Sequence, residues 1–304
     1  MYSQTTHPKS KSSESLRALR KHRSTLNWLQ PLLLLSLPGI WLLLLLVLPT
    51  LIILELSLVP GIRPGEIVNP SGLDNYIKIL DPLYLQVIWR TLFFAVGTTI
   101  ICLICGFPIA YWIAVKITAN WKNLLLLAFV LPLWTSSLLR SYAWISILRP
   151  TGLLNRMLIN LGLPSWELLN HSPAVLIGMS YSLLPYMVLI LYASLEKLDK
   201  RLLEAAADLG ANQIQTFWRV TVPQVITGIG AGSFLVFISA MGDFINPELL
   251  GGASSMTTAR LIYNQFLGAA QNWGFGCALS SSLILVVSIA IALLIKFGEA
   301  TPKR

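Results

Sequence analysis

The sequence predicts an all-α membrane protein with six transmembrane helices and both termini on the cytoplasmic side. The prediction rests on composition, on six long apolar runs and on the placement of basic residues. Of the 304 residues, 55% are hydrophobic and 12% are charged, whereas soluble proteins average roughly 45–50% apolar and about 25% charged residues. So few charges do not suit the surface of a soluble protein, and the many aromatic residues exclude a disordered chain.

Six apolar runs are long enough to cross a bilayer, since a helix needs about 20 residues to span about 30 Å of hydrocarbon. The first run holds sixteen Leu, Ile or Val residues between Leu32 and Ile53, which together favour insertion by about 5–10 kcal/mol. The later runs contain Gly, Pro, Ser and aromatic residues, which membrane helices tolerate when they pack against neighbours. We therefore expect lipid-facing residues to dominate the first span and the later spans to form a bundle. The predicted spans are about 32–54, 87–115, 124–148, 173–195, 222–245 and 274–297.

Basic residues predict the orientation. Most of them precede the first span, lie between spans two and three or four and five, or belong to the end of the chain, and the positive-inside rule places these segments in the cytoplasm. The net charge of +9 is then expected to serve topology and contact with anionic lipid rather than nucleic acid. The residues on this side are Lys9, Lys11, Arg17, Arg20, Lys21, Arg23, Lys116, Lys122, Lys197, Lys200, Arg201, Arg219, Lys296, Lys303 and Arg304.

The expected organisation is a basic cytoplasmic tail at 1–28, a transmembrane domain at 29–298 and a short cytoplasmic tail at 299–304. A removable signal peptide is the rival interpretation of residues 1–50. The apolar run is too long for the h-region of a signal peptide and no small-residue cleavage site follows it, so we expect an uncleaved anchor.

The connection between spans four and five, residues 196–221, is a distinctive cytoplasmic segment. Its first part, 196–209, is rich in helix-forming residues with leucines on one stripe. Gly210 suits the left-handed position after a helix, Asn212 suits the cap of a second short helix, and Pro223 suits the first turn of span five. We therefore expect two short helices joined at a glycine. On physical grounds alone, an interfacial helix among the lipid headgroups is an equal alternative.

The string EAAADLGA at 204–211, with Phe217, Val220 and Pro223 downstream, resembles the cytoplasmic EAA loop of ABC importer permeases. In that family the loop is a coupling helix that sits in a groove of a separate ATPase subunit. The resemblance implies type I ABC importer permease architecture, a dimer of ATPase partners and a place in the inner membrane of a bacterium. It assigns coupling to the ATPase to Glu204, Ala205, Ala206, Asp208, Gly210 and Ala211.

Further strings resemble permeases of the spermidine/putrescine importer group, and the resemblance covers about residues 35–295. It implies that the chain forms half of a polyamine pore, beside a second, different permease. It also implies a soluble substrate-binding protein that docks on the external loops at about 60–86 and 148–172. The strings are LDNYIKILDPLY at Leu73–Tyr84, PLWTSSLLRSYAW at Pro132–Trp144, EKLDK at 196–200 and AMGDFINPELLGG at Ala240–Gly252.

Two alternative functions stay open. A related ABC importer permease for another small solute would share parts of this pattern. A stand-alone ion-coupled carrier would be expected to contain an inverted repeat, and we find none between the first three and the last three spans. The sequence has no P-loop string and no catalytic constellation, so we expect a transporter subunit and not an enzyme. ATP and Mg²⁺ are expected on the partner ATPase, and no cofactor or metal on this chain.

A polyamine that crosses the membrane needs each ammonium group matched by a carboxylate, a carbonyl or an aromatic face. The third predicted span places Trp134 and Trp144 on one face together with two serines. Asp243 lies at membrane depth, where a charge costs about 2.5–3.5 kcal/mol and so normally marks a pairing or a function. The expected substrate pathway consists of Trp134, Tyr142, Trp144, Tyr186, Asp243 and Glu248.

These assignments have structural alternatives. Arg140 would repel a polycation, so we expect it to act as a gate or to form an ion pair with Asp243 between spans three and five. Asp243 is accordingly either the partner of Arg140 or a contact for substrate. The aromatic residues either line the pathway through cation–π contacts or pack and anchor the helices at the membrane interface.

Overall fold

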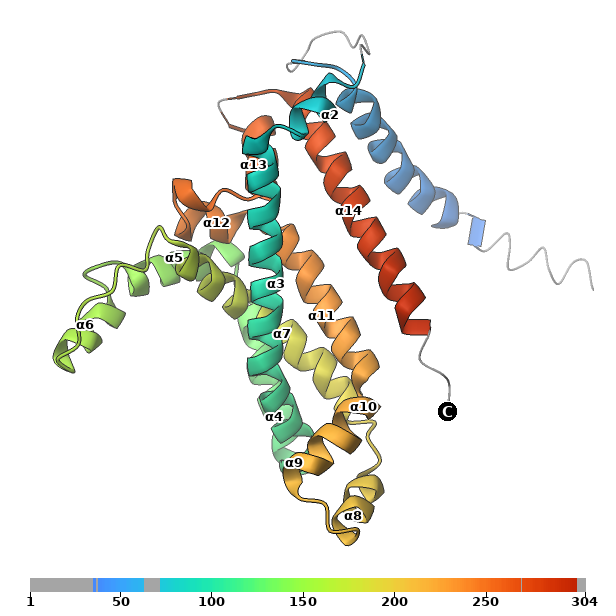
Figure 1. Cartoon of the computed structure of the whole chain (residues 1–304), viewed down its shortest axis with the longest axis vertical. Helices are drawn as coiled ribbons and strands as arrows, with labels where there is room; N and C mark the ends of the chain where they lie inside the picture. Colours follow the sequence, from blue (N-terminus) through green and yellow to red (C-terminus); the bar gives the residue numbers. More distant parts are fainter. Residues whose placement is uncertain (1–34, 37, 63–71, 269, 300–304) are drawn as a thin grey trace, which may run out of the picture. The chain divides into compact units, whose positions relative to one another are not determined.

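The computed structural model describes residues 35–36, 38–62, 72–268 and 270–299 (Figure 1). The predicted tail 1–28, with its basic residues, and residues 300–304 of the second predicted tail lie outside the described residues. The chain divides into two compact units, Met1–Glu55 and Leu56–Arg304.

A long apolar helix, Pro38–Ser57, contains most of the described residues of the first unit. Its mean hydropathy is 2.5, and its leucine side chains are exposed, Leu46 to 72%. Twenty residues of this kind are enough to cross a bilayer. The helix agrees with the first predicted span, of which residues 32–34 and 37 lie outside the described part of the chain.

The described residues of the second unit form helices joined by turns. Their order is α2 (Asp74–Ile79), α3 (Pro82–Tyr111), the π-helical turn η1 (Trp112–Lys116), α4 (Ala119–Val130), the 3₁₀ turn η2 (Leu131–Trp134), α5 (Ser137–Leu148), α6 (Leu153–Asn160), α7 (Ser172–Leu195), α8 (Lys200–Asp208), α9 (Gln213–Thr216), the π-helical turn η3 (Phe217–Thr221), α10 (Val222–Gln224), α11 (Ile226–Met241), α12 (Ile245–Leu250), the 3₁₀ turn η4 (Ala253–Ser255), α13 (Thr258–Phe266) and α14 (Trp273–Glu299).

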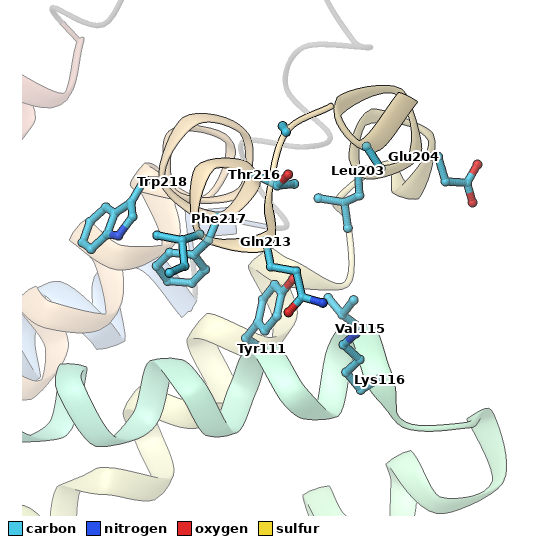
Figure 2. A pocket seen from close by; sticks show the side chains of 12 residues that line it. Tyr111, Val115, Lys116, Leu203, Glu204, Gln213, Thr216, Phe217 and Trp218 are labelled. Atoms are coloured by element: carbon cyan, nitrogen blue, oxygen red, sulfur yellow. The ribbon is translucent and has the colours of Figure 1, made fainter. Parts of the chain in front are cut away.

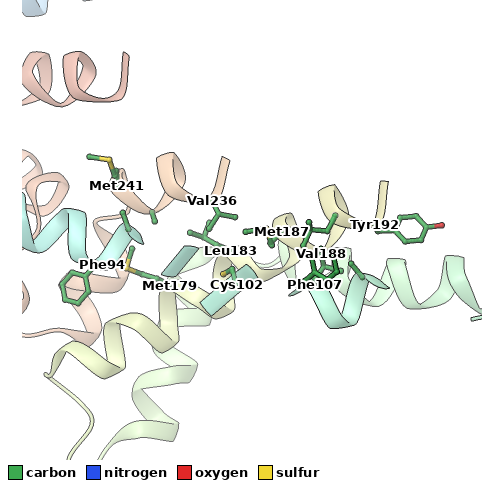
Figure 3. Close-up of a cluster of buried hydrophobic side chains, with 14 of the residues drawn as sticks. Phe94, Cys102, Phe107, Met179, Leu183, Met187, Val188, Tyr192, Val236 and Met241 are labelled. Carbon is green, nitrogen blue, oxygen red and sulfur yellow. The ribbon is translucent and has the colours of Figure 1, made fainter. Parts of the chain in front are cut away.

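Helices α3, α7 and α11 pack together and bury the main apolar core. Figure 3 shows side chains of this core, among them Met187, Val188 and Val236. Glycines let the helices approach closely: a Cβ atom at Gly106 would lie 3.1 Å from Cγ of Met187, and one at Gly232 would lie 3.0 Å from its sulfur. Small residues at helix contacts are the usual means of packing in lipid, where the hydrophobic effect does not drive helices together. The predicted bundle of later spans is confirmed for these three helices.

Two of the predicted spans are bent rather than straight. Asn120–Trp134 meets Ser137–Asn160 at 93°, and Gln213–Gln224 meets Ile226–Met241 at 70°. By length and apolarity, Pro82–Lys116 and α7 can each cross a membrane as single helices, and each bent pair can serve as one further crossing. The number of six crossings and the orientation of the chain stay predictions.

Local backbone conformation accounts for both bends. After Pro132 the chain is extended at Thr135, with φ −82° and ψ 145°, and at Ser136, with φ −57° and ψ 139°. The carbonyl of Pro132 accepts a hydrogen bond of 2.6 Å from Nη1 of Arg140, one turn into α5. At the second bend, Val225 leaves the helical region with φ −106° and ψ 12°. Freed backbone groups at membrane depth need partners of this kind.

A leucine at Gly232 is expected to push α7 and α11 apart, because even its Cβ atom would lie 3.0 Å from Met187 and 3.4 Å from Ile190. Overpacking costs about 1–3 kcal/mol, so the melting temperature in detergent should fall. Leucine at Gly230 is the matched control, since no heavy atom lies within 4 Å of a Cβ atom there. Equal melting temperatures for Gly232→Leu and Gly230→Leu would contradict the packing described.

Candidate functional site

The connection between α7 and α11 contains the two short helices that the sequence predicts, but the first begins later than expected. Helix α7 ends at Leu195, a turn follows, and α8 begins at Lys200. Asp199 accounts for this start, because its Oδ1 accepts a hydrogen bond of 3.0 Å from the backbone N–H of Arg201. The expected helix 196–209 is therefore divided, and only its second part is helix α8.

Gly210 ends α8 as predicted. Its φ is +79°, a conformation that glycine adopts without strain. The N–H of Gly210 donates to the carbonyl of Ala207 at 2.9 Å, and the N–H of Ala211 donates to that of Ala206 at 3.0 Å. These two bonds form a Schellman motif, which satisfies the last carbonyl groups of the helix.

Asn212 caps the second short helix, also as predicted. Its Oδ1 accepts from the N–H of Gln215 at 2.8 Å, while Oε1 of Gln215 accepts from the N–H of Asn212 at 3.1 Å. This reciprocal pair is a capping box and fixes the start of α9 directly after the turn at Gly210. Hydrogen bonds consequently fix the start of α8, its end and the start of α9.

The ring of Phe217 joins the α8–α9 segment to the C-terminal end of α3. It lies 5.2 Å from the ring of Phe107 and 5.8 Å from that of Tyr111, edge-to-face in both cases. Phe217 begins the π-helical turn η3, and α3 ends in a second one, η1, whose Ala114 carbonyl accepts a hydrogen bond of 2.9 Å from Nζ of Lys122. Turns of this type are rare and occur frequently at functional sites.

A cavity of about 550 Å³ lies between the α8–α9 segment and the C-terminal end of α3 (Figure 2). In Figure 2, Tyr111, Val115 and Lys116 rise from α3 and η1, Leu203 points toward them, and the carboxylate of Glu204 points away. The lining residues are Tyr111, Val115, Lys116, Leu203, Glu204, Ala207, Ala211, Gln213, Ile214, Thr216, Phe217 and Trp218.

Most residues assigned to ATPase coupling are accessible on the α8–α9 segment. Glu204, Ala205, Asp208 and Gly210 are exposed, and Ala206 and Ala211 are half-buried. This surface carries acidic and small side chains, and Phe217 holds the segment against α3. The backbone of a partner protein can therefore approach it closely. This surface is the first of the two candidate sites.

The second candidate site surrounds α12, where the predicted pathway acids lie. Oδ1 of Asp243 accepts from the backbone N–H of Ile245 at 3.0 Å and of Asn246 at 3.2 Å, and its Oδ2 accepts from Nδ2 of Asn246 at 2.6 Å. The buried Asn246 in turn accepts a hydrogen bond of 3.0 Å from the hydroxyl of Ser141. These bonds connect the end of α11, through α12, to α5.

Glu248 forms an ion pair with Nε of Arg260 in α13. Nη1 of Arg260 also donates to the carbonyl of Gly252 at 2.5 Å and to that of Pro247 at 3.3 Å. Arg260 thereby binds a carbonyl within α12 and a carbonyl just after its end. The ion pair offsets the charge of Glu248, whose place in the substrate pathway stays a prediction.

The ion pair expected between Arg140 and Asp243 is not formed in this structure. Nη1 of Arg140 donates to the carbonyl of Pro132. Asp243 obtains its hydrogen bonds from the first turn of α12 instead. Arg140 therefore stabilises the bend between α4 and α5. Its role as a gate stays a prediction.

The pathway aromatics are distributed along η2, α5 and α7. The half-buried Trp144 packs edge-to-face on Tyr181, with ring centroids 5.5 Å apart. Trp134 is 79% exposed, Tyr142 55% and Tyr186 40%. These three rings are therefore free to contact lipid, a second subunit or a solute.

Sequence reasoning missed the partners of the acids. Neither Asn246 nor Arg260 was predicted as a site residue. Asn246 gave a local signal, because it stands three residues after Asp243, and an aspartate just before a helix commonly accepts from the N–H three residues on. Arg260 gave no local signal, because it is twelve residues from Glu248 and belongs to another helix. Within the described ranges, no three His, Cys, Asp or Glu side chains gather where they could hold a metal ion.

Comparison with known proteins places this geometry in a family. The family described as "Binding-protein-dependent transport system inner membrane component" matches residues 16–298. The spermidine/putrescine transport system permease protein PotB of Haemophilus influenzae is 42% identical over 253 residues, which is 83% of this chain and 88% of that protein. PotB of Escherichia coli K12 is 41% identical over 253 residues, 83% of this chain and 91% of that protein.

A solved structure has the same fold. It is the crystal structure of a bacterial ABC transporter involved in the import of the acidic polysaccharide alginate, in which the matched chain is 19% identical. The TM-score is 0.70, and the match covers 94% of this chain and 100% of that chain. The chain belongs to the family of inner membrane components of binding-protein-dependent transport systems.

Proposed function

We propose that this chain is the membrane-spanning permease subunit of an ABC importer and forms half of the pore for polyamines such as spermidine and putrescine. The observation that carries the proposal is the 41–42% identity to spermidine/putrescine permeases over 83% of the chain. The family match at residues 16–298 includes the α8–α9 segment, the α12 region and the helices between them, so it contains both candidate sites.

Energy for transport comes from a separate ATPase dimer that binds ATP and Mg²⁺, while this chain binds neither. The exposed residues Glu204, Ala205 and Asp208 of the α8–α9 segment form the surface that the ATPase holds. When the ATPase subunits close, the segment moves as a unit because the Schellman motif and the capping box brace it. Phe217 then carries the movement into α3, and the pore alternates between inward and outward access.

A soluble binding protein delivers the substrate to the external loops, and a second, different permease completes the pore. The pathway runs past Trp134, Tyr142, Trp144 and Tyr186, whose faces suit ammonium groups. Asp243 supplies negative charge at the α12 end, and Glu248, whose charge is offset by Arg260, supplies carboxylate oxygens there. Their carboxylate oxygens can each accept more than one hydrogen bond, so an arriving ammonium can share them with Asn246 and Arg260.

Loss of the gene is expected to abolish energy-dependent uptake of labelled spermidine or putrescine, and a plasmid copy is expected to restore it. Uptake of a labelled amino acid serves as the control for membrane energy. The test is a comparison of initial uptake rates in deleted, complemented and parental cells. Unchanged polyamine uptake in deleted cells that lack other polyamine importers would contradict the proposed substrate.

Asp243→Asn separates a substrate contact from a structural role. Asparagine keeps an oxygen for the backbone N–H groups of Ile245 and Asn246 but removes the charge, and it loses the hydrogen bond from Nδ2 of Asn246 because its own Nδ2 is a donor. Because a hydrogen bond to a charged group contributes about 1.5–3 kcal/mol, the KM for spermidine should rise roughly tenfold or more, with little change in membrane insertion. Glu55→Gln, at an exposed position in the helix Pro38–Ser57, is the control. An unchanged KM in well-folded Asp243→Asn protein would restrict Asp243 to its structural role.

A further inference from the structure

Two contacts near opposite ends of α3 connect this helix to both candidate sites. Near its C-terminal end, Phe107 and Tyr111 hold the ring of Phe217. Near its N-terminal end, Thr91 holds the start of α13, the helix that carries Arg260. Figure 1 shows α13 beside the N-terminal end of α3 and α9 beside the other end. Helix α3 therefore contacts the elements on which both candidate sites depend.

The hydroxyl group of Thr91 makes three hydrogen bonds, which is all that a hydroxyl group can make. It donates its one proton to the carbonyl of Val87, one turn earlier in α3, at 2.8 Å. Its oxygen accepts from the backbone N–H of Thr258 at 2.8 Å. The hydroxyl oxygens of Thr91 and Thr258 lie 2.9 Å apart. Because the proton of Thr91 is already used, the hydroxyl of Thr258 is the donor in this third bond.

Burial makes these bonds costly to lose. Thr91 is 2% exposed and Thr258 is 3% exposed, so water has little access to either residue. Thr258 is the first residue of α13, and the first N–H groups of a helix have no partner within that helix. The hydroxyl of Thr91 in α3 therefore satisfies a buried donor that α13 cannot satisfy itself.

The first turn of α13 also positions Arg260. Thr257, just before the helix, accepts a hydrogen bond of 3.4 Å from the backbone N–H of Arg260. The side chain of Arg260 binds Glu248 and two carbonyl groups of the α12 region. A displacement of the first turn of α13 would therefore move Arg260 and the part of the α12 region that it binds.

One continuous helix joins the two contacts of α3. Thr91 and Phe107 are sixteen residues apart within α3, which corresponds to about 24 Å along the helix axis. Pro108, the proline inside this helix, comes after both residues. Rigid secondary-structure elements are among the structures that carry coupling between distant sites. Movement at Phe107 can therefore reach Thr91 through the helix itself.

Apolar contacts also hold α13, but they hold it less specifically. Leu261 and Ile262 pack against a buried cluster formed by α2 and α14. Such contacts depend on the area removed from water and have no preferred direction, whereas a hydrogen bond needs a defined distance and angle. The bonds of Thr91 consequently fix the position of α13 relative to α3.

We propose that Thr91 is a positioning residue that couples α3 to α13, so that movement of the α8–α9 segment reaches Arg260 and the α12 region. The inference rests on the proposed function as an ABC importer permease. The movement passes from Phe217 to α3, from Thr91 to α13, and from Arg260 to the α12 region. A competing route runs through α11, which packs against α3 and leads directly into α12.

Thr91→Val tests the proposal in the assembled importer, with the ATPase, the second permease and the binding protein present in vesicles. Valine is close to threonine in shape, but it leaves the N–H and the hydroxyl of Thr258 without their acceptor. The measurement is the number of polyamine molecules transported per ATP hydrolysed. We expect this ratio to fall about fivefold or more, the lower end for a coupling free energy between sites, while ATP hydrolysis continues.

Thr99→Val is the matched control. Thr99 lies in the same helix and donates to the carbonyl of Ala95 at 2.7 Å, so its hydrogen bond stays within α3. The ratio should be the same in Thr99→Val as in the parental importer. Thr91→Ser keeps the hydroxyl group and should also keep the parental ratio.

The ratio separates coupling from stability. A variant that is only less stable gives less assembled importer, which lowers transport and hydrolysis together and leaves their ratio unchanged. If Thr91→Val does not assemble, Thr258→Val decides, because it removes the hydroxyl donor and keeps the backbone bond to Thr91. Its ratio should fall less, by about twofold.

An unchanged ratio in the assembled valine variant would overturn the proposal and assign the movement to α11. A ratio in Thr91→Ser as low as that in Thr91→Val would also overturn it, because the hydroxyl group would not be the cause. Polyamine transport by the parental importer tests the proposed function separately, since the role of Thr91 is judged only from the variants relative to that parent.

Discussion

The aromatic contact of Phe217 with Phe107 and Tyr111 connects the α8–α9 segment to the long helix α3. On one side of the contact lies the braced α8–α9 segment, whose accessible residues suit a cytoplasmic partner. On the other side lies α3, which packs against α7 and α11. Movement passes through a contact only if the contact is stiff, and edge-to-face rings 5.2–5.8 Å apart between the π-helical turn η3 and the last turns of α3 supply such a contact.

The close packing of the core helices and the stabilised bends beside them both follow from the properties of a hydrocarbon environment. In hydrocarbon, helices associate by close packing and by satisfied polar groups. Glycines provide the close packing between α7 and α11, and the bends are held by side chains that bind freed backbone groups. Arg140 binds the carbonyl of Pro132, Asp243 binds the first turn of α12, and Arg260 binds the carbonyl of Gly252. Charged residues at the α12 end therefore stabilise the irregular backbone on which the proposed pathway depends.

The conformation of the α8–α9 segment could be predicted because it depends on residues that are neighbours in the sequence. The left-handed conformation of Gly210 and the cap at Asn212 are properties of a few consecutive residues, and the structure has both. The division of the third span was not predicted, because hydropathy measures how apolar a segment is and not the direction of its axis. Partners such as Ser141 and Asn246, which are 105 residues apart, meet only through tertiary packing. The sequence alone consequently left the role of Asp243 open between two readings, and the structure shows a third set of contacts.

The most direct measurement is the ratio of solute transported to ATP hydrolysed by the assembled importer in vesicles, with Phe217 replaced by alanine. The account predicts that Phe217→Ala retains ATP hydrolysis but loses most transport, because the α8–α9 segment moves without moving α3. Trp121 of α4, which is 61% exposed and lies outside the α8–α9 segment, gives the control Trp121→Ala, for which the ratio should change little. An unchanged ratio of transport to hydrolysis in Phe217→Ala would contradict the claim that this contact transmits the motion of the ATPase.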